Sequence, residues 1–372
     1  MRRRFLYSIL ALLALTSAAV ALSACGSSSS EGGPAEGGTT EINSTWLYTG
    51  PLEDGGWNKQ QRVAMDATSE MPGVTVKSID NVPYSQQATQ LINQSIAGGS
   101  NLISETLGLG TLMSTACQQS PDVYCFGHGD PAPQPPNVVS YWVEDWNFGY
   151  VAGVAAGLTT ETGTIGFVAA SKIPTIMQAI NSYTLGCRSV LPDCQVRVVF
   201  LNSYYDPPAN AQATRSLINA GADVLRTFVD DPSACGVVEK AGVWIIGQFE
   251  DYKPRCPNAT ITSTMWTLTD FWEEQIKLIQ DGKFKGSGEE PLFVPVTNEP
   301  GGPHLGGFGS FVPADVKKQI KDTYQKIVDG EKVFVGPIKD QSGAVKIEAG
   351  ETLSPRYLMS EWDWFVEGVK AS

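Results

Sequence analysis

The sequence has few histidines, few basic residues and none of the short motifs that mark the common enzyme classes. Two histidines are present, and 26 lysine and arginine residues stand against 39 aspartate and glutamate residues, for a formal net charge of −13. A surface this acidic repels phosphate backbones, which argues against nucleic-acid binding. The patterns GxSxG, HExxH and SxxK and the kinase motif set are all absent. We therefore expect no enzyme, no catalytic residues and no cofactor.

Only one hydrophobic run of notable length occurs, and it lies at the N-terminus. Three arginines precede an apolar run over residues 5–21, and Leu22-Ser23-Ala24-Cys25 follows, which matches the lipobox of exported lipoproteins. The run is shorter than the roughly 20 residues of a membrane span, which argues against a plain transmembrane anchor. We expect residues 1–25 to be a signal peptide, Cys25 to carry lipid, and residues 26–42 to form a flexible tether. The remaining chain would then lie on the extracytoplasmic face of the cell membrane.

An even number of cysteines remains once Cys25 is set aside. In an exported chain this number suggests disulfides, because the compartment is oxidising. No CxxC pattern occurs and the histidines lie far from any cysteine cluster, so we expect no metal site. The sequence allows about fifteen sets of pairs. Short loops favour Cys117–Cys125 and Cys187–Cys194, and Cys235–Cys256 is then left by elimination.

From residue 45 onward, short apolar runs alternate with longer amphipathic stretches, a pattern typical of βαβ units. The sequence predicts an α/β fold in which two doubly wound parallel-sheet lobes are joined by a hinge. The expected helices include 85–97, 148–158, 208–220 and 268–280. The expected strands form two series of five, 46–49, 74–78, 102–105, 123–126 and 138–141, then 163–169, 196–201, 223–227, 243–247 and 259–263.

We expect the chain to pass between the two lobes more than once. The N-terminal lobe would comprise residues 43–145 and 265–303, and the C-terminal lobe residues 146–264 and 304–372. In doubly wound sheets, ligands bind at the carboxyl ends of the strands. The ligand is therefore expected in the cleft between the two lobes.

Aromatic residues, carboxylates and amides recur just after the expected strands. Such side chains suit a flat, uncharged ligand, because rings stack on its faces and oxygens accept hydrogen bonds from its edges. Asp206 and Asp230 could instead cap helices, since prolines follow them closely, and Trp146 could simply pack under the hinge. The candidate ligand-binding residues are Asp54, Trp57, Asn58, Glu105, Thr106, Trp146, Asn202, Asp206, Asp230, Gln248, Asp251 and Trp266.

A family pattern is spread over the chain after the tether, in segments 46–57, 150–157, 162–168, 202–207, 221–224, 247–251, 336–340 and 364–368. Together these segments resemble the basic membrane protein family of substrate-binding lipoproteins. The resemblance implies a type I periplasmic-binding fold and delivery of purine bases or nucleosides to an ABC importer. It also implies that Trp57 stacks on the base and that Asp251 accepts from its polar edge or from a ribose.

The turn at residues 53–57 is most similar to the branch of that family associated with adenine-like ligands. That branch carries Gly-Asp-His-Gly-Trp, whereas this chain reads Glu53-Asp54-Gly55-Gly56-Trp57 and lacks the histidine. The choice between base and nucleoside therefore stays open, with an adenine-like ligand favoured. The expected partners are the purine, the ABC permease subunits and the membrane that the lipid on Cys25 would enter, and the protein is expected to be a monomer.

Two alternatives share the same fold. A sugar-binding lipoprotein is one, because tryptophan and carboxylates also suit pyranose rings. Lysine and arginine are sparse after the expected strands, which favours the purine. A lipoprotein that senses a ligand is the other alternative, and it would share every feature of a transport protein.

Overall fold

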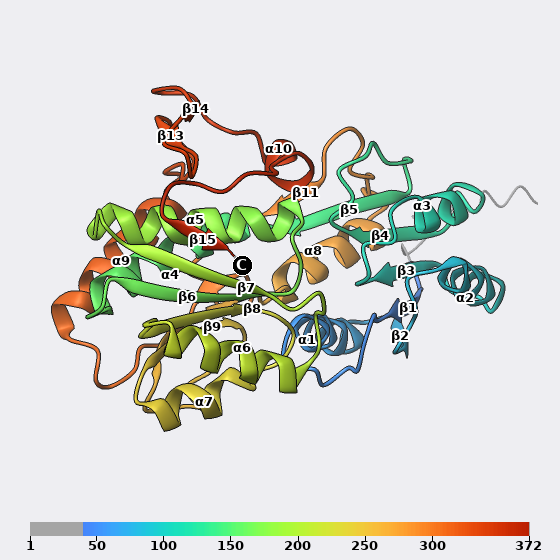
Figure 1. Cartoon of the computed structure of the whole chain (residues 1–372). Coiled ribbons are helices and arrows are strands. Elements are labelled where there is room, and N and C mark those ends of the chain that lie inside the picture. The colour runs from blue at the N-terminus through green and yellow to red at the C-terminus, as the bar shows by residue number, and fades with distance from the viewer. Residues whose placement is uncertain (1–39, 372) are drawn as a thin grey trace, which may run out of the picture. The chain divides into compact units, whose positions relative to one another are not determined.

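Two sheets built almost entirely of parallel strands form two lobes, as the sequence predicts (Figure 1). The computed structural model describes residues 40–371. The expected signal peptide, the lipidation site Cys25 and most of the expected tether lie outside these described residues. Within residues 40–371, no helix combines the length and the apolar character needed to cross a membrane.

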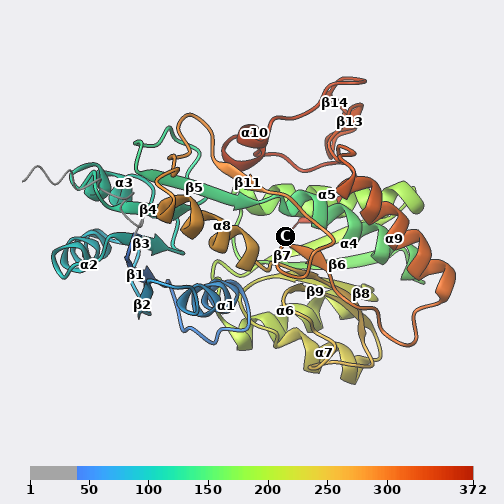
Figure 2. The ribbon, with the colours of Figure 1, turned by 180° about the vertical axis from the view of Figure 1, so that it is seen from behind.

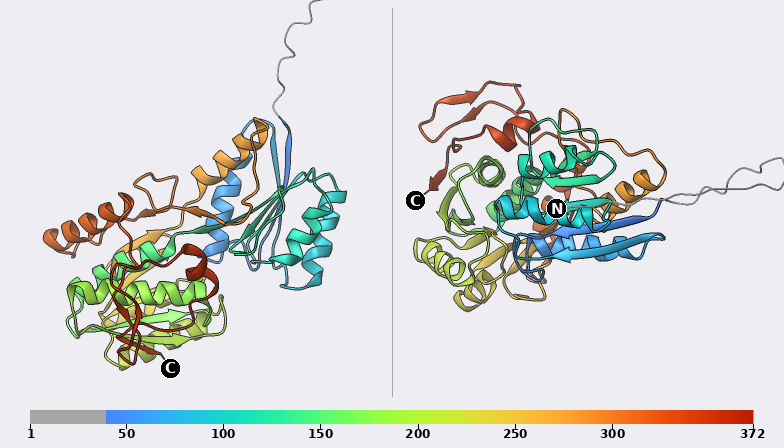
Figure 3. Two further views of the ribbon diagram at one scale, coloured as in Figure 1. Left: turned by 90° about the horizontal axis from the view of Figure 1, so that it is seen from above. Right: turned by 90° about the vertical axis from the view of Figure 1, so that its right-hand side faces the viewer.

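The first sheet has the strand order β11-β5-β4-β3-β1-β2, and every neighbouring pair is parallel. Helices α1 and α8 pack together on one face (Figure 2), and α2 and α3 pack on the opposite face (Figure 3). The strands are β1 (Ile42–Leu47), β2 (Val74–Ile79), β3 (Leu102–Glu105), β4 (Tyr124–His128), β5 (Val138–Val143) and β11 (Leu292–Val294). The helices are α1 (Trp57–Ser69), α2 (Gln86–Ala97), α3 (Thr111–Gln118) and α8 (Thr269–Gln280).

The second sheet has the order β12-β10-β9-β8-β6-β7-β15, and only the β12–β10 pair is antiparallel. Its strands are β6 (Thr164–Ala169), β7 (Gln195–Phe200), β8 (Val224–Phe228), β9 (Trp244–Phe249), β10 (Thr260–Met265), β12 (His304–Leu305) and β15 (Val369–Ala371). Its helices are α4 (Asp145–Thr159), α5 (Pro174–Val190), α6 (Pro207–Asn219), α7 (Ala234–Ala241) and α9 (Ala314–Val328). The last part of the chain adds β13 (Ile338–Lys339), β14 (Val345–Ile347) and α10 (Pro355–Ser360).

The strand predictions need two corrections. Strand β1 begins at Ile42, inside the expected tether and four residues before the expected strand. Its first half is polar, yet Ser44 and Thr45 are buried because their hydroxyls bond to Thr75 O and to Ser100 Oγ. The sequence does not predict the short strands β11, β12, β13, β14 and β15, because two or three residues carry no periodic signal.

The chain passes between the sheets at three places in the described part of the chain. The first crossing leads from β5 into α4, the second from β10 into α8, and the third from β11 into β12. Residues just before and just after these crossings therefore lie between the lobes. Of the three disulfides, Cys117–Cys125 and Cys187–Cys194 are the two that the loop lengths favour, and Cys235–Cys256 is the one left by elimination.

Helices α4 and α5 approach each other closely, because their contact is made by backbone rather than by side chains. Gly149, Gly153 and Gly157 recur every fourth residue along one face of α4. A Cβ at Gly153 would clash with the carbonyl oxygen of Tyr183, and a Cβ at Gly186 would clash with that of Tyr150. The pair can pack at this distance only while these positions are glycine.

We expect Gly153→Ala to lower the free energy of unfolding by about 1–3 kcal/mol, since a methyl group there forces two helix backbones apart. Chemical denaturation measures the change. Gly236→Ala in α7 is the matched control, because a Cβ at Gly236 meets nothing within 4 Å. The control should be neutral or stabilising by up to about 1 kcal/mol through helix propensity. Equal effects in both variants would contradict the close packing.

Candidate functional site

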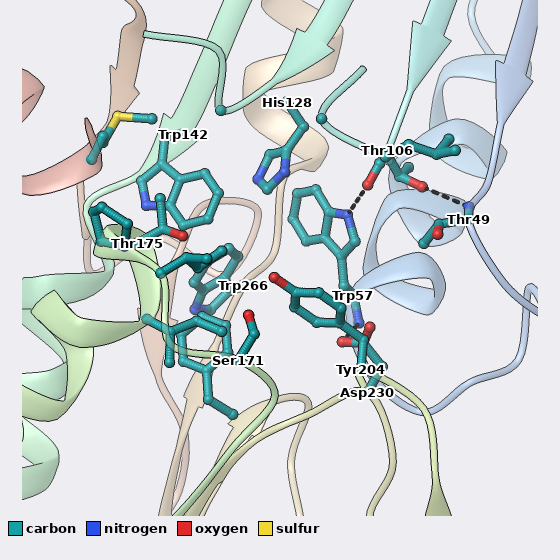
Figure 4. A pocket seen from close by; sticks show the side chains of 18 of the residues that line it. Thr49, Trp57, Thr106, His128, Trp142, Ser171, Thr175, Tyr204, Asp230 and Trp266 are labelled. Atoms are coloured by element: carbon teal, nitrogen blue, oxygen red, sulfur yellow. Dashed lines mark hydrogen bonds between the residues drawn. The ribbon is translucent and has the colours of Figure 1, made fainter. Parts of the chain in front are cut away.

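A cavity of about 600 Å³ lies between the lobes, at the carboxyl ends of the strands of both sheets. Figure 4 shows side chains of the first lobe above it and side chains of the second lobe below it. Met359 of α10 also reaches its wall, so the last part of the chain contributes to the cavity. The first lobe contributes Thr49, Trp57, Thr106, His128 and Trp142, and the second lobe Ser171, Thr175, Tyr204, Phe228, Asp230 and Phe249, with Trp266 at the second crossing.

Three rings of the first lobe stand in a row along the cavity. The imidazole of His128 lies between the indoles of Trp57 and Trp142, with ring centroids 4.1 Å and 4.4 Å apart. Trp266 meets both indoles edge-on, at 5.6 Å from Trp57 and 5.8 Å from Trp142 (Figure 4). The cavity is therefore lined by aromatic surface on several sides, which suits a flat ligand.

Trp57 is held by groups from both lobes. It is the first residue of α1, and its indole Nε1 donates to the carbonyl oxygen of Thr106 at 3.1 Å. Its backbone N–H donates to Oδ1 of Asp230, in the second lobe, at 3.3 Å. The first N–H groups of a helix have no partner within the helix, so this carboxylate from the other lobe completes the helix terminus.

The lobes touch beside this helix terminus. A Cβ at Gly56 would lie 2.5 Å from Cα of Asp230, so only glycine permits the approach. Nearby, Lys59 of the first lobe pairs with Glu250 of the second at 2.7 Å, and Glu250 also accepts from Arg255 at 2.6 Å. These contacts hold the lobes together around the cavity.

Few charged side chains line the cavity. None of its lining residues is lysine or arginine, and Asp230 is the one carboxylate among them. Burial raises the pKa of Asp230 well above its ordinary value, and the neighbouring carboxylate of Asp54 raises it further. A ligand phosphate would thus find no countercharge among the described lining residues.

His128 is uncharged near neutral pH. Burial lowers the pKa of its imidazole to about 3. Its Nε2 has no hydrogen-bond partner in the part of the chain that the structure describes, and neither has Nε1 of Trp142. Both side chains line the cavity, and both atoms are buried polar atoms without a partner among the described residues.

Four of the twelve predicted binding residues line the cavity, namely Trp57, Thr106, Asp230 and Trp266. Thr106 also accepts from the backbone N–H of Thr49 at 3.2 Å and donates to Oδ1 of Asn58 at 2.9 Å. The other eight, Asp54, Asn58, Glu105, Trp146, Asn202, Asp206, Gln248 and Asp251, lie outside its lining.

Three of these eight satisfy backbone or side-chain groups near a helix start. The carboxylate of Asp54 accepts from the N–H groups of Gly56, Asn58 and Lys59, at 2.8–3.1 Å. The side-chain oxygen of Asn58 accepts from the hydroxyl of Thr106 at 2.9 Å. Asp206 caps α6 by accepting from the N–H of Ala209 at 3.0 Å, the alternative already raised by the proline that follows it.

The carboxylate of Glu105 is bonded to backbone N–H groups and lies outside the cavity lining. Its side chain is fully buried and accepts from the N–H groups of Leu107, Gly108, Leu109 and His128. Burial raises its pKa to about 7, while these four donors act in the opposite direction. The carboxylate thus fixes the loop after β3 and the end of β4, where His128 stands.

The remaining four lie elsewhere. Asp251 is partly exposed, accepts from the N–H of Lys253 at 3.0 Å and pairs with its Nζ at 3.5 Å. Asn202 occupies a turn with φ of 55°. Gln248 is fully buried in β9, and both its amide atoms are unpaired among the described residues. Trp146 lines a separate cavity of about 340 Å³, bounded by residues of α4, α9 and α10.

Five further lining residues are not among the twelve predicted from the sequence, namely His128, Trp142, Ser171, Tyr204 and Phe249. The strand-end rule, that ligands bind at the carboxyl ends of parallel strands, selected Trp57. His128 ends β4 and Trp142 lies next to the end of β5, so both residues fit the same rule. His128 follows the fourth expected strand, 123–126, by two residues. Tyr204 carried a signal too, since it follows β7 by a few residues.

We expect acid to destabilise the protein partly through His128. An unfolded histidine titrates near 6.5, whereas the buried imidazole has a pKa of about 3. Below pH 6.5 the unfolded state binds a proton that the folded state does not, so stability is lost as the pH falls. Between pH 7 and 5 the wild type should lose up to about 2 kcal/mol more than His128→Phe, which keeps a ring between the indoles. Denaturation curves at both pH values measure this, and parallel pH dependence would contradict it.

The sequence is similar to a known family of proteins and to individual relatives. Residues 42–291 match the family model described as ABC transporter substrate-binding protein PnrA-like. A purine-binding protein from Brucella abortus is 30% identical over 336 residues, which cover 87% of this chain and 91% of the relative. A protein from Haloferax volcanii, named as an ABC transporter glucose-binding protein, is 30% identical over 352 residues, covering 91% of this chain and 82% of the relative.

A solved structure shares the fold. The crystal structure of ABC transporter solute-binding proteins from Aeropyrum pernix superposes with a TM-score of 0.67 at 17% identity, over 80% of this chain and 93% of the other. The match of two-lobed fold, interlobe cavity and family model agrees with the resemblance found in the sequence. The chain belongs to the PnrA-like family of ABC transporter substrate-binding proteins, and it is therefore a binding protein and not an enzyme.

Proposed function

We propose that this protein captures a purine base or nucleoside in the interlobe cavity, on the extracytoplasmic face of the membrane, and delivers it to an ABC permease. The observation that carries the proposal is the cavity itself, which combines aromatic walls with hydroxyls and lacks lysine and arginine. An adenine-like ligand is favoured. Lipid on Cys25 would keep the protein near its permease and raise its effective concentration there.

The aromatic walls support a flat ring as ligand. Trp57, Trp142 and Trp266 present indoles from three segments that are far apart in the sequence. Aromatic pairs contribute about 0.5–1.5 kcal/mol beyond the area they bury. A planar heterocycle gains this on each face that meets an indole, whereas a saturated ring gains less.

The polar lining supports a neutral ligand with hydrogen bonds at its edges. Hydroxyls of Thr106, Ser171, Thr175 and Tyr204 line the cavity together with the carboxyl group of Asp230. Such groups can both donate and accept, which matches the mixed edge of a purine or the hydroxyls of a ribose. The lack of cations disfavours phosphorylated nucleotides.

The expected mechanism is capture by closure. A ligand in this cavity contacts residues of both lobes, so its contacts are complete only when the lobes meet. The ligand therefore shifts the hinge equilibrium toward the closed form. The contacts of Gly56 with Asp230 and of Lys59 with Glu250 add to the same state.

A thermal-shift panel of bases, nucleosides, nucleotides and sugars tests the proposal on the purified protein. We expect adenine, adenosine or a related purine to raise the melting temperature, since a ligand at 100 times its Kd adds about 2.7 kcal/mol of stability. Nucleoside phosphates and glucose should not. A shift with glucose alone would replace the purine by a sugar, and a shift with no member of the panel would overturn the proposal.

Asp230 lines the cavity, whereas Asp251, the residue that the family resemblance implies for ligand binding, does not. We expect Asp230→Asn to weaken binding of the purine found in the panel by about tenfold or more, since its carboxyl group lines the cavity. Asp251→Asn is the matched control and should leave the affinity within about twofold, because Asp251 bonds to Lys253 outside the cavity. Calorimetry measures both affinities. A large loss for Asp251→Asn with none for Asp230→Asn would contradict the assignment.

A further inference from the structure

Arg226 is a buried cation in the second lobe. It stands in β8, between β6 and β9, opposite Phe167 on one side and Ile246 on the other. Its side chain is fully buried, and its Nη2 lies 3.9 Å from Oδ1 of Asp145, which is fully buried as well. Replacing such a pair by apolar residues of similar volume is often neutral or stabilising. A gain in folding stability is therefore a weak explanation for the presence of this buried ion pair.

Asp145 and Trp266 connect two of the crossings between the lobes. Asp145 is the first residue of α4, directly after the first crossing, and Trp266 follows β10 at the second crossing. Nε1 of Trp266 donates to Oδ1 of Asp145 at 3.2 Å. The oxygen that faces Arg226 is therefore also the one that holds the indole.

Trp266 stands between this pair and the cavity. Its indole is 1% exposed, lines the cavity, and meets Trp57 and Trp142 edge-on (Figure 4). Its ring centroid also lies 5.0 Å from that of Phe249. A rotation of this indole would change the shape of the cavity wall at the point where four aromatic rings meet.

We propose that Asp145, whose buried charge Arg226 offsets, positions Trp266 as a wall of the ligand site. Arg226, on a central strand of the second sheet, lies 3.9 Å from the carboxylate as an ion pair. Asp145 accepts the hydrogen bond of the indole N–H and so fixes the orientation of the ring. Asp145 does not line the cavity, so it acts through Trp266. The proposal rests on the proposed function, because it takes the cavity to be the ligand site.

Two double variants separate positioning from stability. Asp145→Asn with Arg226→Met removes both charges and keeps a side-chain oxygen for Trp266. Asp145→Leu with Arg226→Met removes both charges and that oxygen. Neither leaves an unpaired buried charge, so both are expected to fold. The two variants then differ in the hydrogen bond to the indole.

Near-ultraviolet circular dichroism reports the indole without any ligand. The signal of Trp266 is obtained by subtracting the spectrum of the same protein with Trp266→Phe. We expect the Asn-containing double variant to keep the wild-type Trp266 signal and the Leu-containing one to lose at least half of it. Calorimetry with adenosine should show affinity within about threefold of wild type for the former and a loss of at least tenfold for the latter.

Equal Trp266 spectra, or equal adenosine affinities, in the two double variants would overturn the positioning role. Should the Leu-containing variant not fold, the Asn-containing pair of changes is tested with and without Trp266→Phe. Its effect on adenosine affinity should stay below about threefold in both backgrounds, and a tenfold loss would refute the proposal. Should the wild type bind no purine, the proposed function fails, and the Trp266 spectra still decide the positioning role.

Discussion

The close approach of the two lobes at the start of α1 is the contact on which the site depends. Gly56 has no side chain, so the backbone of the second lobe at Asp230 can lie against it. The first N–H groups of the helix need acceptors, and two carboxylates supply them, Asp54 from the preceding loop and Asp230 from the other lobe. This shared helix terminus places Trp57 between the lobes, and the cavity forms beside its indole.

The chemistry of the cavity follows from which groups are left unsatisfied. Most acids near the strand ends are already bonded to backbone N–H groups, so they bring no ionised oxygen to a ligand. Four donors saturate the oxygens of Glu105, and burial keeps His128 neutral. What remains is aromatic surface, hydroxyls and one buried carboxyl group, Asp230. Such a site gains most from an uncharged planar ligand, and its family supplies the transport role.

The alternation of apolar runs and amphipathic stretches was enough to predict both sheets, because parallel strands are buried on both faces and read as apolar runs. It could not show β12 or β15, which are short edge strands, nor the polar first half of β1, whose hydroxyls find partners only in the folded chain. The strand-end rule found Trp57 and Trp266. It could not separate Asp230 from Asp206, because a carboxylate after a strand looks the same in the sequence whether it caps its own helix or reaches across a cleft.

Mass spectrometry of small molecules released from the purified protein by denaturation identifies directly what the cavity holds. We expect a purine base or nucleoside in stoichiometric amount, lost from a variant in which Gly56→Val prevents the lobes from meeting. A hexose or a phosphorylated compound released in its place would show that the cavity does not hold an uncharged planar heterocycle.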